Sequence, residues 1–275
     1  MSEPKYTAED LKIMRSWDLE RKIRVSQAKI IEWYQHYDSQ VYVSFSGGKD
    51  STILMDLARR IYPDIPALFI DTGLELPEIK SFVRTFSNVD FARPELSFAQ
   101  VIKKYGYPVV SKEVAHAVYY AKKTGTKSSD NYLQRFDGTL MYNGKKSLYN
   151  MKKWKFLLDS GFDISDCCCD VLKKRPAKKY GRLTGRKAII GTLTEESRLR
   201  TQHWLKDGCN AFDGKEPKSH PLSFWTEQNI LQYLRTTNIP YATVYGDIVE
   251  DENGKLKTTG CERTGCWGYA FLEHI

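Results

Sequence analysis

The sequence predicts an α/β protein with a doubly wound, mostly parallel sheet and flanking helices. Short apolar segments typical of buried strands alternate along the chain with segments whose apolar residues recur at helical spacing. Such alternation is typical of parallel strands joined by helices. The expected strands are 41–45, 67–71, 89–92 and 187–191. The expected helices lie within 7–37 and at 53–61, 77–86, 97–105, 111–123 and 227–236.

Three regions are expected along the chain. Residues 1–38 are predicted to form an N-terminal helical segment that packs on the core. Residues 39–240 would form the main α/β domain, with an insertion near 124–150 where polar residues and glycines show no clean periodicity. Residues 241–275 are rich in turn residues and contain two cysteines, so we expect a turn-rich C-terminal tail.

Composition limits the class of protein and its surroundings. The chain has 275 residues, of which 41% are hydrophobic and 28% charged. It has no apolar run near the roughly 18 residues of a membrane span, and its first residues lack the pattern of a signal peptide. We therefore expect a cytoplasmic protein with no membrane partner. In a reducing compartment, six cysteines indicate metal or redox chemistry rather than a disulfide framework.

The positive charge is concentrated in one part of the chain. The formal net charge is +8, and the stretch from Lys145 to Lys187 holds thirteen basic and four acidic residues, a net +9. Two interpretations stay open: a solvated basic face, or a surface that binds phosphate or nucleic acid.

The run Ser46-Gly47-Gly48-Lys49-Asp50-Ser51 lies between an expected strand and an expected helix. Backbone N–H groups converge in such a loop, and the helix N-terminus favours an anion. The Walker pattern does not fit, because Val43 stands at its first glycine and Asp50 follows the lysine. Lys49 would offset charge on a leaving pyrophosphate, and Asp50 would help a Mg²⁺ ion or orient the loop. A turn without a ligand is the alternative.

This run resembles the pyrophosphate loop (PP-loop) of the ATP pyrophosphatases, also called the adenine nucleotide α-hydrolase superfamily. In that superfamily the loop holds the β- and γ-phosphates of ATP while an acceptor oxygen attacks the α-phosphorus. The resemblance implies ATP and Mg²⁺ as cofactors and Lys49, Asp50 and Ser51 as catalytic residues. It also implies a nucleotide-binding loop made of Ser44, Ser46, Gly47, Gly48, Lys49, Asp50, Ser51 and Thr52.

From about residue 30 onward, the chain resembles the phosphoadenosine-phosphosulfate reductase family of that superfamily. The likeness lies in Asp71-Thr72-Gly73 with Leu76-Pro77-Glu78, Tyr105-Gly106-Tyr107-Pro108, the segment 168–176, and Gly191 with Glu195-Glu196-Ser197 and Arg200. It adds Asp71, Thr72, Gly191, Glu196 and Arg200 to the nucleotide site. Arg263, beside the last two cysteines, would contact a phosphate or sulfur group of the substrate or serve a structural turn.

Four cysteines are candidate metal ligands: Cys168, Cys169, Cys261 and Cys266. Their order resembles that of cluster-bearing sulfonucleotide reductases, which implies a [4Fe-4S] cluster. In those proteins the second pair is C-x-x-C, whereas this chain has four residues between Cys261 and Cys266. Zinc and free or redox-active thiols remain alternatives.

Departures from the family pattern favour ATP over a sulfonucleotide. Leu193 stands where the sulfate-binding arginine is expected, no cysteine follows Cys266 to act as the C-terminal nucleophile, and Lys49 suits a β,γ-pyrophosphate. The leading hypothesis is an enzyme that adenylates an acceptor for sulfur insertion. The acceptor would be DNA, transfer RNA or a nucleotide, and the sulfur donor a cysteine desulfurase or thioredoxin-like protein. A sulfonucleotide reductase and a non-catalytic nucleotide-binding subunit are the alternatives, and a homo-oligomer is left open.

Overall fold

The computed structural model describes residues 4–123, 127–213 and 216–264. These residues form two compact units, each with its own core. The first contains the chain up to Ile70, Glu75–Ala92 and Ala177–Thr264, and the second contains Asp71–Leu74 and Arg93–Pro176. The boundaries predicted at residues 38 and 240 remain predictions.

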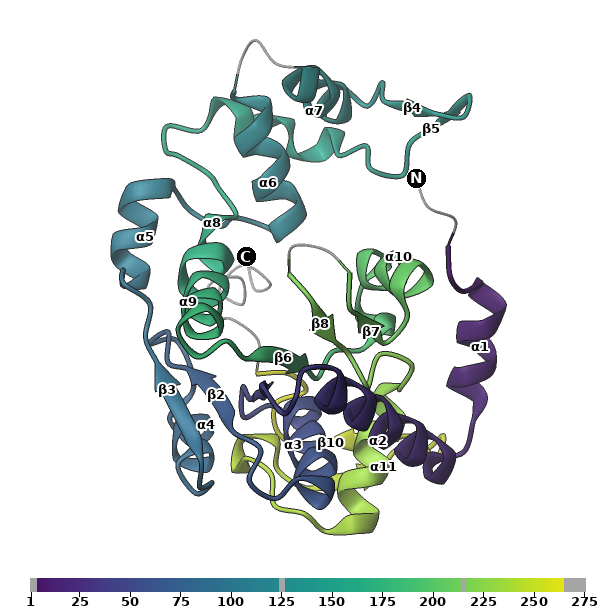
Figure 1. Ribbon diagram of the computed structural model, residues 1–275. Coiled ribbons are helices and arrows are strands. Elements are labelled where there is room, and N and C mark those ends of the chain that lie inside the picture. The colour runs from purple at the N-terminus through teal and green to yellow at the C-terminus, as the bar shows by residue number, and fades with distance from the viewer. Residues whose placement is uncertain (1–3, 124–126, 214–215, 265–275) are drawn as a thin grey trace. The chain divides into compact units, whose positions relative to one another are not determined.

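A six-stranded sheet organises the first unit, in the order β3-β2-β1-β6-β8-β7 (Figure 1). The first five strands pair in parallel, and β7 is antiparallel to β8. The predicted mostly parallel sheet is therefore confirmed. The strands are β1 (Val41–Ser44), β2 (Ala67–Ile70), β3 (Val89–Ala92), β6 (Lys187–Ile190), β7 (Asn210–Ala211) and β8 (Lys218–Ser219).

Helices cover both faces of this sheet. Successive side chains of a strand point to opposite faces, and β1 shows what lies on each. Val41 and Val43 are fully buried in a core with residues of α3, whereas the Tyr42 ring packs edge-on against Tyr180 of α9, 4.9 Å between centroids. The helices are α1 (Ala8–Ser16), α2 (Leu19–His36), α3 (Lys49–Ile61), α4 (Pro77–Val83), α9 (Arg175–Thr184, of which Arg175 and Pro176 belong to the second unit), α10 (Arg198–Asp207) and α11 (Glu227–Thr237).

The predicted N-terminal helical segment consists of two helices, α1 and α2. Thr7 and Asp10 form a capping box at the start of α1, and the Asp18 side chain caps α2 through the N–H of Arg21. Trp17, between the two helices, has extended backbone angles, so the helical path breaks there. Ile30 and Trp33 of α2 are fully buried and pack into the core of the first unit.

Two short helices and a hairpin complete the first unit near its C-terminal end. The 3₁₀ helices are η3 (Thr194–Glu196) and η4 (Thr243–Tyr245), and the antiparallel strands are β9 (Ile248–Glu250) and β10 (Leu256–Thr258). Phe224, Trp225 and Tyr233 are fully buried here, and Trp204 nearly so. All four pack in the hydrophobic core of the first unit.

The second unit is mainly helical. One hydrophobic core lies under α6, α7 and η1, and another joins α5 to the segment of α8 and η2. Residues 124–150 showed no periodicity in the sequence, yet the structure has a helix and a hairpin between 127 and 146. Its elements are α5 (Phe98–Tyr105), α6 (Lys112–Ala121), α7 (Lys127–Asp137), β4 (Met141–Tyr142), β5 (Lys145–Lys146), η1 (Lys152–Asp159), α8 (Cys167–Cys169) and the π-helical turn η2 (Asp170–Lys174).

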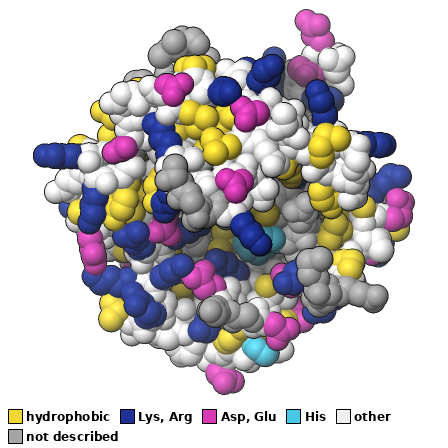
Figure 2. Space-filling model, turned by 90° about the horizontal axis from the view of Figure 1, so that it is seen from above, with side chains coloured by type: hydrophobic (Ala, Val, Ile, Leu, Met, Phe, Trp, Pro, Cys, Tyr) yellow, Lys and Arg dark blue, Asp and Glu magenta, His cyan; other side chains and the backbone are white. Residues whose placement is uncertain are grey.

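Basic and hydrophobic side chains are interspersed on the face shown in Figure 2. The basic stretch found in the sequence divides between the two units, because 145–175 belong to the second and 178–187 to the first. No helix of the described segments is long and apolar enough to cross a membrane.

Candidate active site

The predicted phosphate loop joins the end of β1 to the start of α3. Gly47 has a φ of +73°, in the left-handed region that favours glycine. A Cβ atom there would lie 2.8 Å from Cγ2 of Val83 and 2.9 Å from Cγ2 of Ile79, so packing against α4 also requires glycine. Gly48 then caps α3 without a side chain. The backbone can therefore turn sharply into the helix.

Side-chain hydroxyls hold the loop in shape. Ser51 Oγ donates to the Gly48 carbonyl at 2.9 Å and lies 3.0 Å from Ser46 Oγ, and it accepts from the Ser46 N–H at 3.2 Å. Thr52 Oγ1 also donates to the Gly48 carbonyl. Ser51 and Thr52 are buried, whereas Ser46 is exposed. Of these three hydroxyls, that of Ser46 is the one open to a ligand.

The ammonium group of Lys49 is buried in the first unit and is 6% exposed. Lys49 Nζ forms an ion pair with Glu227, the first residue of α11, and lies 5.2 Å from the ring centroid of Tyr245. The N–H of Glu227 in turn donates to a carboxylate oxygen of Glu195. A carboxylate on one helix therefore balances the charge of the loop lysine on another.

Two arginines add positive charge beside the loop. Arg200 and Arg263 both pair with Glu196, Arg263 Nη1 lying 3.3 Å from Glu196 Oε1. Because β1 and β6 are neighbouring parallel strands, the segments that hold Lys49 and Arg200 leave the sheet at the same end. Arg263 joins them through its ion pair with Glu196. Three cations near a helix N-terminus form a site suited to a polyanion.

Gly191 fixes the distance between β6 and the loop. A Cβ at this position would lie 3.0 Å from the carbonyl oxygen of Asp50 and 3.2 Å from the nitrogen of Ser51. The chain leaving β6 therefore passes against the first turn of α3. This close approach places Glu196 and Arg200 next to the loop.

Asp50 is the acidic group of the loop, and its pKa is raised to about 6. Burial is the main cause, and the neighbouring carboxylate of Glu227 adds to it, whereas Lys49, Arg263 and Arg200 act in the opposite direction. A carboxyl group with this pKa changes its protonation near pH 6. The role of Asp50 in orienting the loop or a magnesium ion stays a prediction.

Asp71 and Thr72 belong to the second unit. Asp71 accepts hydrogen bonds from Arg93 Nη2 at 3.3 Å and from the Gly73 N–H at 3.2 Å, and Thr72 Oγ1 accepts from the Leu74 N–H. These bonds shape the turn after β2. The predicted contact of Asp71 and Thr72 with the nucleoside remains a prediction.

The predicted metal ligands also divide between units. Cys168 is buried and Cys169 is half-buried in the second unit, Cys261 is exposed in the first, and Cys266 lies outside the described residues. A hydrogen bond from Cys168, together with Lys112 and Lys173, lowers the pKa of Cys169 to about 6. Among the described residues, no group of three or more His, Cys, Asp and Glu side chains could hold a metal ion.

Glu227 and Tyr245 contact the loop lysine but were not predicted as site residues from the sequence. Glu227 stood in the sequence as a residue in the first turn of a helix, and the 178 positions between it and Lys49 gave no sign of contact. The Tyr245 hydroxyl lies 2.6 Å from Thr264 Oγ1. A Cβ atom on Gly48 would lie 3.4 Å from the same Tyr245 hydroxyl. Tyr245 therefore covers the loop from the C-terminal side of the chain.

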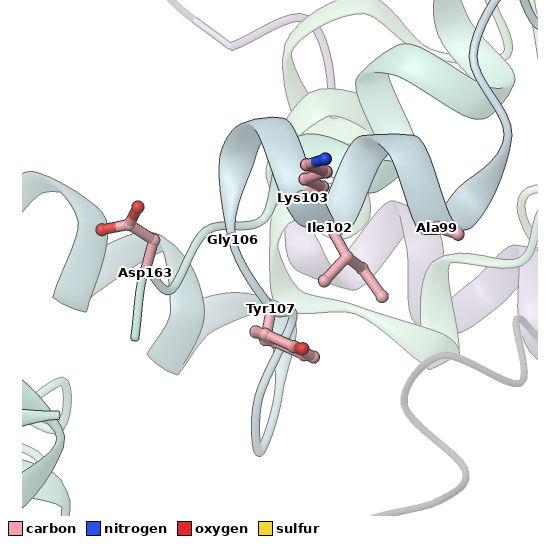
Figure 3. A pocket seen from close by; sticks show the side chains of 6 residues that line it. All are labelled: Ala99, Ile102, Lys103, Gly106, Tyr107 and Asp163. Carbon is pink, nitrogen blue, oxygen red and sulfur yellow. The ribbon is translucent and has the colours of Figure 1, made fainter. Parts of the chain in front are cut away.

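A cavity of about 430 Å³ lies in the second unit (Figure 3). The residues predicted for nucleotide binding do not line it. Its wall includes the end of α5, where a Cβ on Gly106 would lie 2.4 Å from the carbonyl of Asp163. The lining residues are Ala99, Ile102, Lys103, Gly106, Tyr107 and Asp163.

The raised pKa of Asp50 predicts a pH dependence of stability. A carboxyl group whose pKa is higher in the folded than in the unfolded protein destabilises the fold as it ionises. The free energy of unfolding should therefore fall as the pH rises from about 4 to about 6 and stay level above that range. Asp50→Asn should flatten this dependence and stabilise the protein at pH 7 by about 1 to 2 kcal/mol, allowing for partial exposure. Urea unfolding of both proteins at several pH values measures the free energy of unfolding.

The exposed Asp64→Asn is the control, because it removes the same charge away from the loop. An Asp50→Asn protein whose unfolding follows the wild-type pH profile would contradict the assignment.

Comparisons with known proteins agree with the predicted family. The model of the phosphoadenosine phosphosulfate reductase domain matches residues 40–148 and 139–269. An adenosine 5'-phosphosulfate reductase of Staphylococcus epidermidis is 27% identical over 217 residues, 78% of this chain and 68% of that protein. A phosphoadenosine 5'-phosphosulfate reductase of Proteus mirabilis is 23% identical over 262 residues, which are 93% of this chain and 82% of that protein. The phosphoadenylyl-sulfate reductase structure from Candida auris aligns at 13% identity with a TM-score of 0.45, covering 92% of this chain and all of that one. The chain belongs to the phosphoadenosine phosphosulfate reductase family, within the PP-loop superfamily.

Proposed function

We propose that this protein is a sulfonucleotide reductase that binds adenylyl sulfate or its 3'-phosphorylated form at the Ser46–Ser51 loop. The observation that carries the proposal is the cluster of Lys49, Arg200 and Arg263 at that loop, in a chain whose relatives include enzymes named for this reaction. An adenine nucleotide with an anhydride on its α-phosphate presents the negative charge that such a cluster binds.

The reaction is a two-electron reduction. A dithiol gives up two electrons and two protons, the bond between sulfur and the anhydride oxygen breaks, and sulfite, a disulfide and AMP are formed, or adenosine 3',5'-bisphosphate from the 3'-phosphorylated substrate. The oxygen that stays on AMP gains negative charge as the bond breaks. Lys49 and the first N–H groups of α3 would stabilise that charge, and Arg200 and Arg263 would hold the anionic group in place. A thioredoxin-like protein would supply the thiols.

Leu193 limits how the sulfate group could be held. This side chain stands where the family pattern has an arginine, and it is 1% exposed within the hydrophobic core of the first unit. It cannot contact an anion. Arg263 would take over the role, because its guanidinium is largely exposed and lies beside the Arg200–Glu196 pair.

ATP-dependent adenylation is the second candidate, and Lys49 favours it. A buried lysine at the start of α3 suits the β,γ-pyrophosphate of ATP, which carries more charge than a sulfate. In this reaction an acceptor oxygen attacks the α-phosphorus, magnesium pyrophosphate leaves, and sulfur from a donor protein then displaces AMP. The acceptor would be a nucleotide, DNA or transfer RNA. A nucleotide-binding subunit without catalysis would show neither reaction.

We also propose that Cys168 and Cys169 hold an iron-sulfur cluster together with Cys261 and Cys266. Support comes from the donor chemistry: Cys168 and Cys169 are consecutive, their thiols are hydrogen bonded, and the low pKa of Cys169 favours the thiolate that binds iron. A cluster of this kind supplies a redox-active or charged centre. The reaction at the loop does not depend on it in this proposal.

The products of a substrate panel should separate the candidate reactions. With adenylyl sulfate or its 3'-phosphorylated form and reduced thioredoxin, we expect sulfite and the nucleoside phosphate in equal amounts from at least one of the two, measured by a sulfite assay and chromatography. With ATP, magnesium and nucleic acid, we expect no pyrophosphate. Pyrophosphate and AMP in the second reaction, with no sulfite in the first, would establish adenylation instead. Tight nucleotide binding without any product would indicate a binding subunit.

Lys49→Ala should weaken nucleotide binding by about tenfold or more, because a charge-assisted hydrogen bond to phosphate is lost. Isothermal titration with adenylyl sulfate and with ATP measures the effect.

Glu227→Gln should tighten nucleotide binding, since Lys49 is then released from its ion pair. The exposed Lys206→Ala on α10 is the matched control and should bind as the wild type does. Equal affinities of Lys49→Ala and Lys206→Ala would exclude the loop as the nucleotide site.

Protein purified without oxygen, or reconstituted with iron and sulfide, should contain both elements in about equal amounts, close to four of each per chain. Cys168→Ser and Cys169→Ser should lose most of the iron, because each removes a thiolate ligand. Cys209→Ser is the control: its thiol is buried in the core of the first unit. Reconstituted wild-type protein without iron and sulfide would refute the cluster.

A further inference from the structure

Residues 138–156 of the second unit form a surface with an unusual composition. Five lysines and four aromatic residues occur in this segment, and no aspartate or glutamate does. The segment includes the β4–β5 hairpin and the start of η1. We call it the 138–156 surface. We propose that the 138–156 surface binds single-stranded nucleic acid by base stacking and phosphate contacts, independently of the reaction at the PP-loop.

Aromatic rings are open to solvent on this surface. Tyr142 is 74% exposed, Phe156 63% and Tyr149 43%. Large apolar side chains usually lie inside a protein, so several exposed ones in one segment indicate a binding surface. Every base has a flat π-face, and stacking on aromatic side chains is the common way to bind single strands without sequence preference.

Lysines lie between these rings along the chain. Lys145 and Lys146 form β5, and Lys152 and Lys153 begin η1. All four are exposed, and within the described residues no ion pair involves them. Lys155 differs, because its Nζ forms an ion pair with Asp137 Oδ1 at 2.7 Å. Four cations without a protein counterion can neutralise phosphates and release bound salt ions.

Contacts with α7 keep the surface in one conformation. The guanidinium of Arg135 lies 4.7 Å from the ring centroid of Tyr132 and 5.2 Å from that of Tyr149. The Asn150 side chain accepts a hydrogen bond from the Leu140 N–H at 3.2 Å and donates one to the Leu140 carbonyl at 3.1 Å. These two bonds tie the two ends of the hairpin together. Rings and cations are therefore presented on an ordered backbone, and less ordering entropy is lost on binding.

A nucleic acid fits these features better than a membrane does. Membrane-surface segments are amphipathic helices with an apolar face long enough to enter the lipid. Here the exposed rings lie on a two-residue strand (Tyr142), in a turn (Tyr149) and on a 3₁₀ helix (Phe156), and two of them carry hydroxyl groups. Rings separated by lysines match the repeat of base and phosphate in a single strand.

Fluorescence anisotropy with a labelled oligothymidylate of about 15 nucleotides tests the proposal. Lys145→Ala/Lys146→Ala should weaken binding at least tenfold and reduce the slope of log K against log salt by about 1.4, since two phosphate contacts are lost. Tyr142→Ala should weaken binding about tenfold with the slope unchanged, because stacking carries no charge. A duplex of the same length should bind more weakly than the single strand.

Matched controls lie in the same unit. Lys103→Ala/Lys104→Ala removes the same charge from exposed positions of α5, and Tyr107→Ala removes a ring that is 49% exposed. Both should bind as the wild type does, and melting curves check that all variants fold. The proposal is overturned if the control variants weaken oligothymidylate binding as much as Lys145→Ala/Lys146→Ala and Tyr142→Ala do. It is also overturned if Tyr142→Ala has no effect on binding, or if the duplex binds as tightly as the single strand. Binding to vesicles of anionic lipid that responds to these variants, while oligothymidylate binding does not, would assign the surface to membranes instead.

Discussion

The close approach of two backbones, at Gly191 and at the first turn of α3, determines the geometry of the candidate site. Because β1 and β6 pair in parallel along four residues, both chains leave the sheet at the same edge. A side chain on Gly191 would meet the backbone of Asp50 and Ser51, so the approach requires a glycine. The segment after Gly191 then contributes Glu196 and Arg200. The loop alone would be a turn with one lysine, and this contact makes it part of a larger charged site.

The three cations of the candidate site contact two carboxylates. Lys49 faces Glu227, while Arg200 and Arg263 share Glu196. Asp50 lies among these groups, and its raised pKa reflects how little water reaches it. These carboxylates hold the three cations in place without a ligand. A ligand at the loop must exchange with Glu227 for contact with Lys49, whereas the guanidinium of Arg263 is largely exposed beside Glu196.

The loop and four strands of the sheet could be predicted from the sequence because they depend on local patterns, whereas β7 and β8, of two residues each, were missed. Val41–Phe45 and Ala67–Asp71 are apolar runs bounded by turn residues, and the six residues of the loop are contiguous. Glu227 and Tyr245 could not be predicted, since their contacts with the loop join residues almost two hundred positions apart. Helix α7 was missed for another reason. Its residues are mostly polar, and only tertiary packing of Phe136 and Tyr132 against α6 and η1 stabilises it.

The Lys49–Glu227 ion pair has a consequence for selectivity among anions. Glu227 is anchored on α11, so its carboxylate faces Lys49 at a high effective concentration that does not change with the buffer. An anion reaches the Lys49 ammonium only by displacing this carboxylate. A ligand that also extends to Arg200 or Arg263 gains contacts that a small anion at Lys49 alone would lack. The carboxylate therefore favours anions long enough to span the three cations.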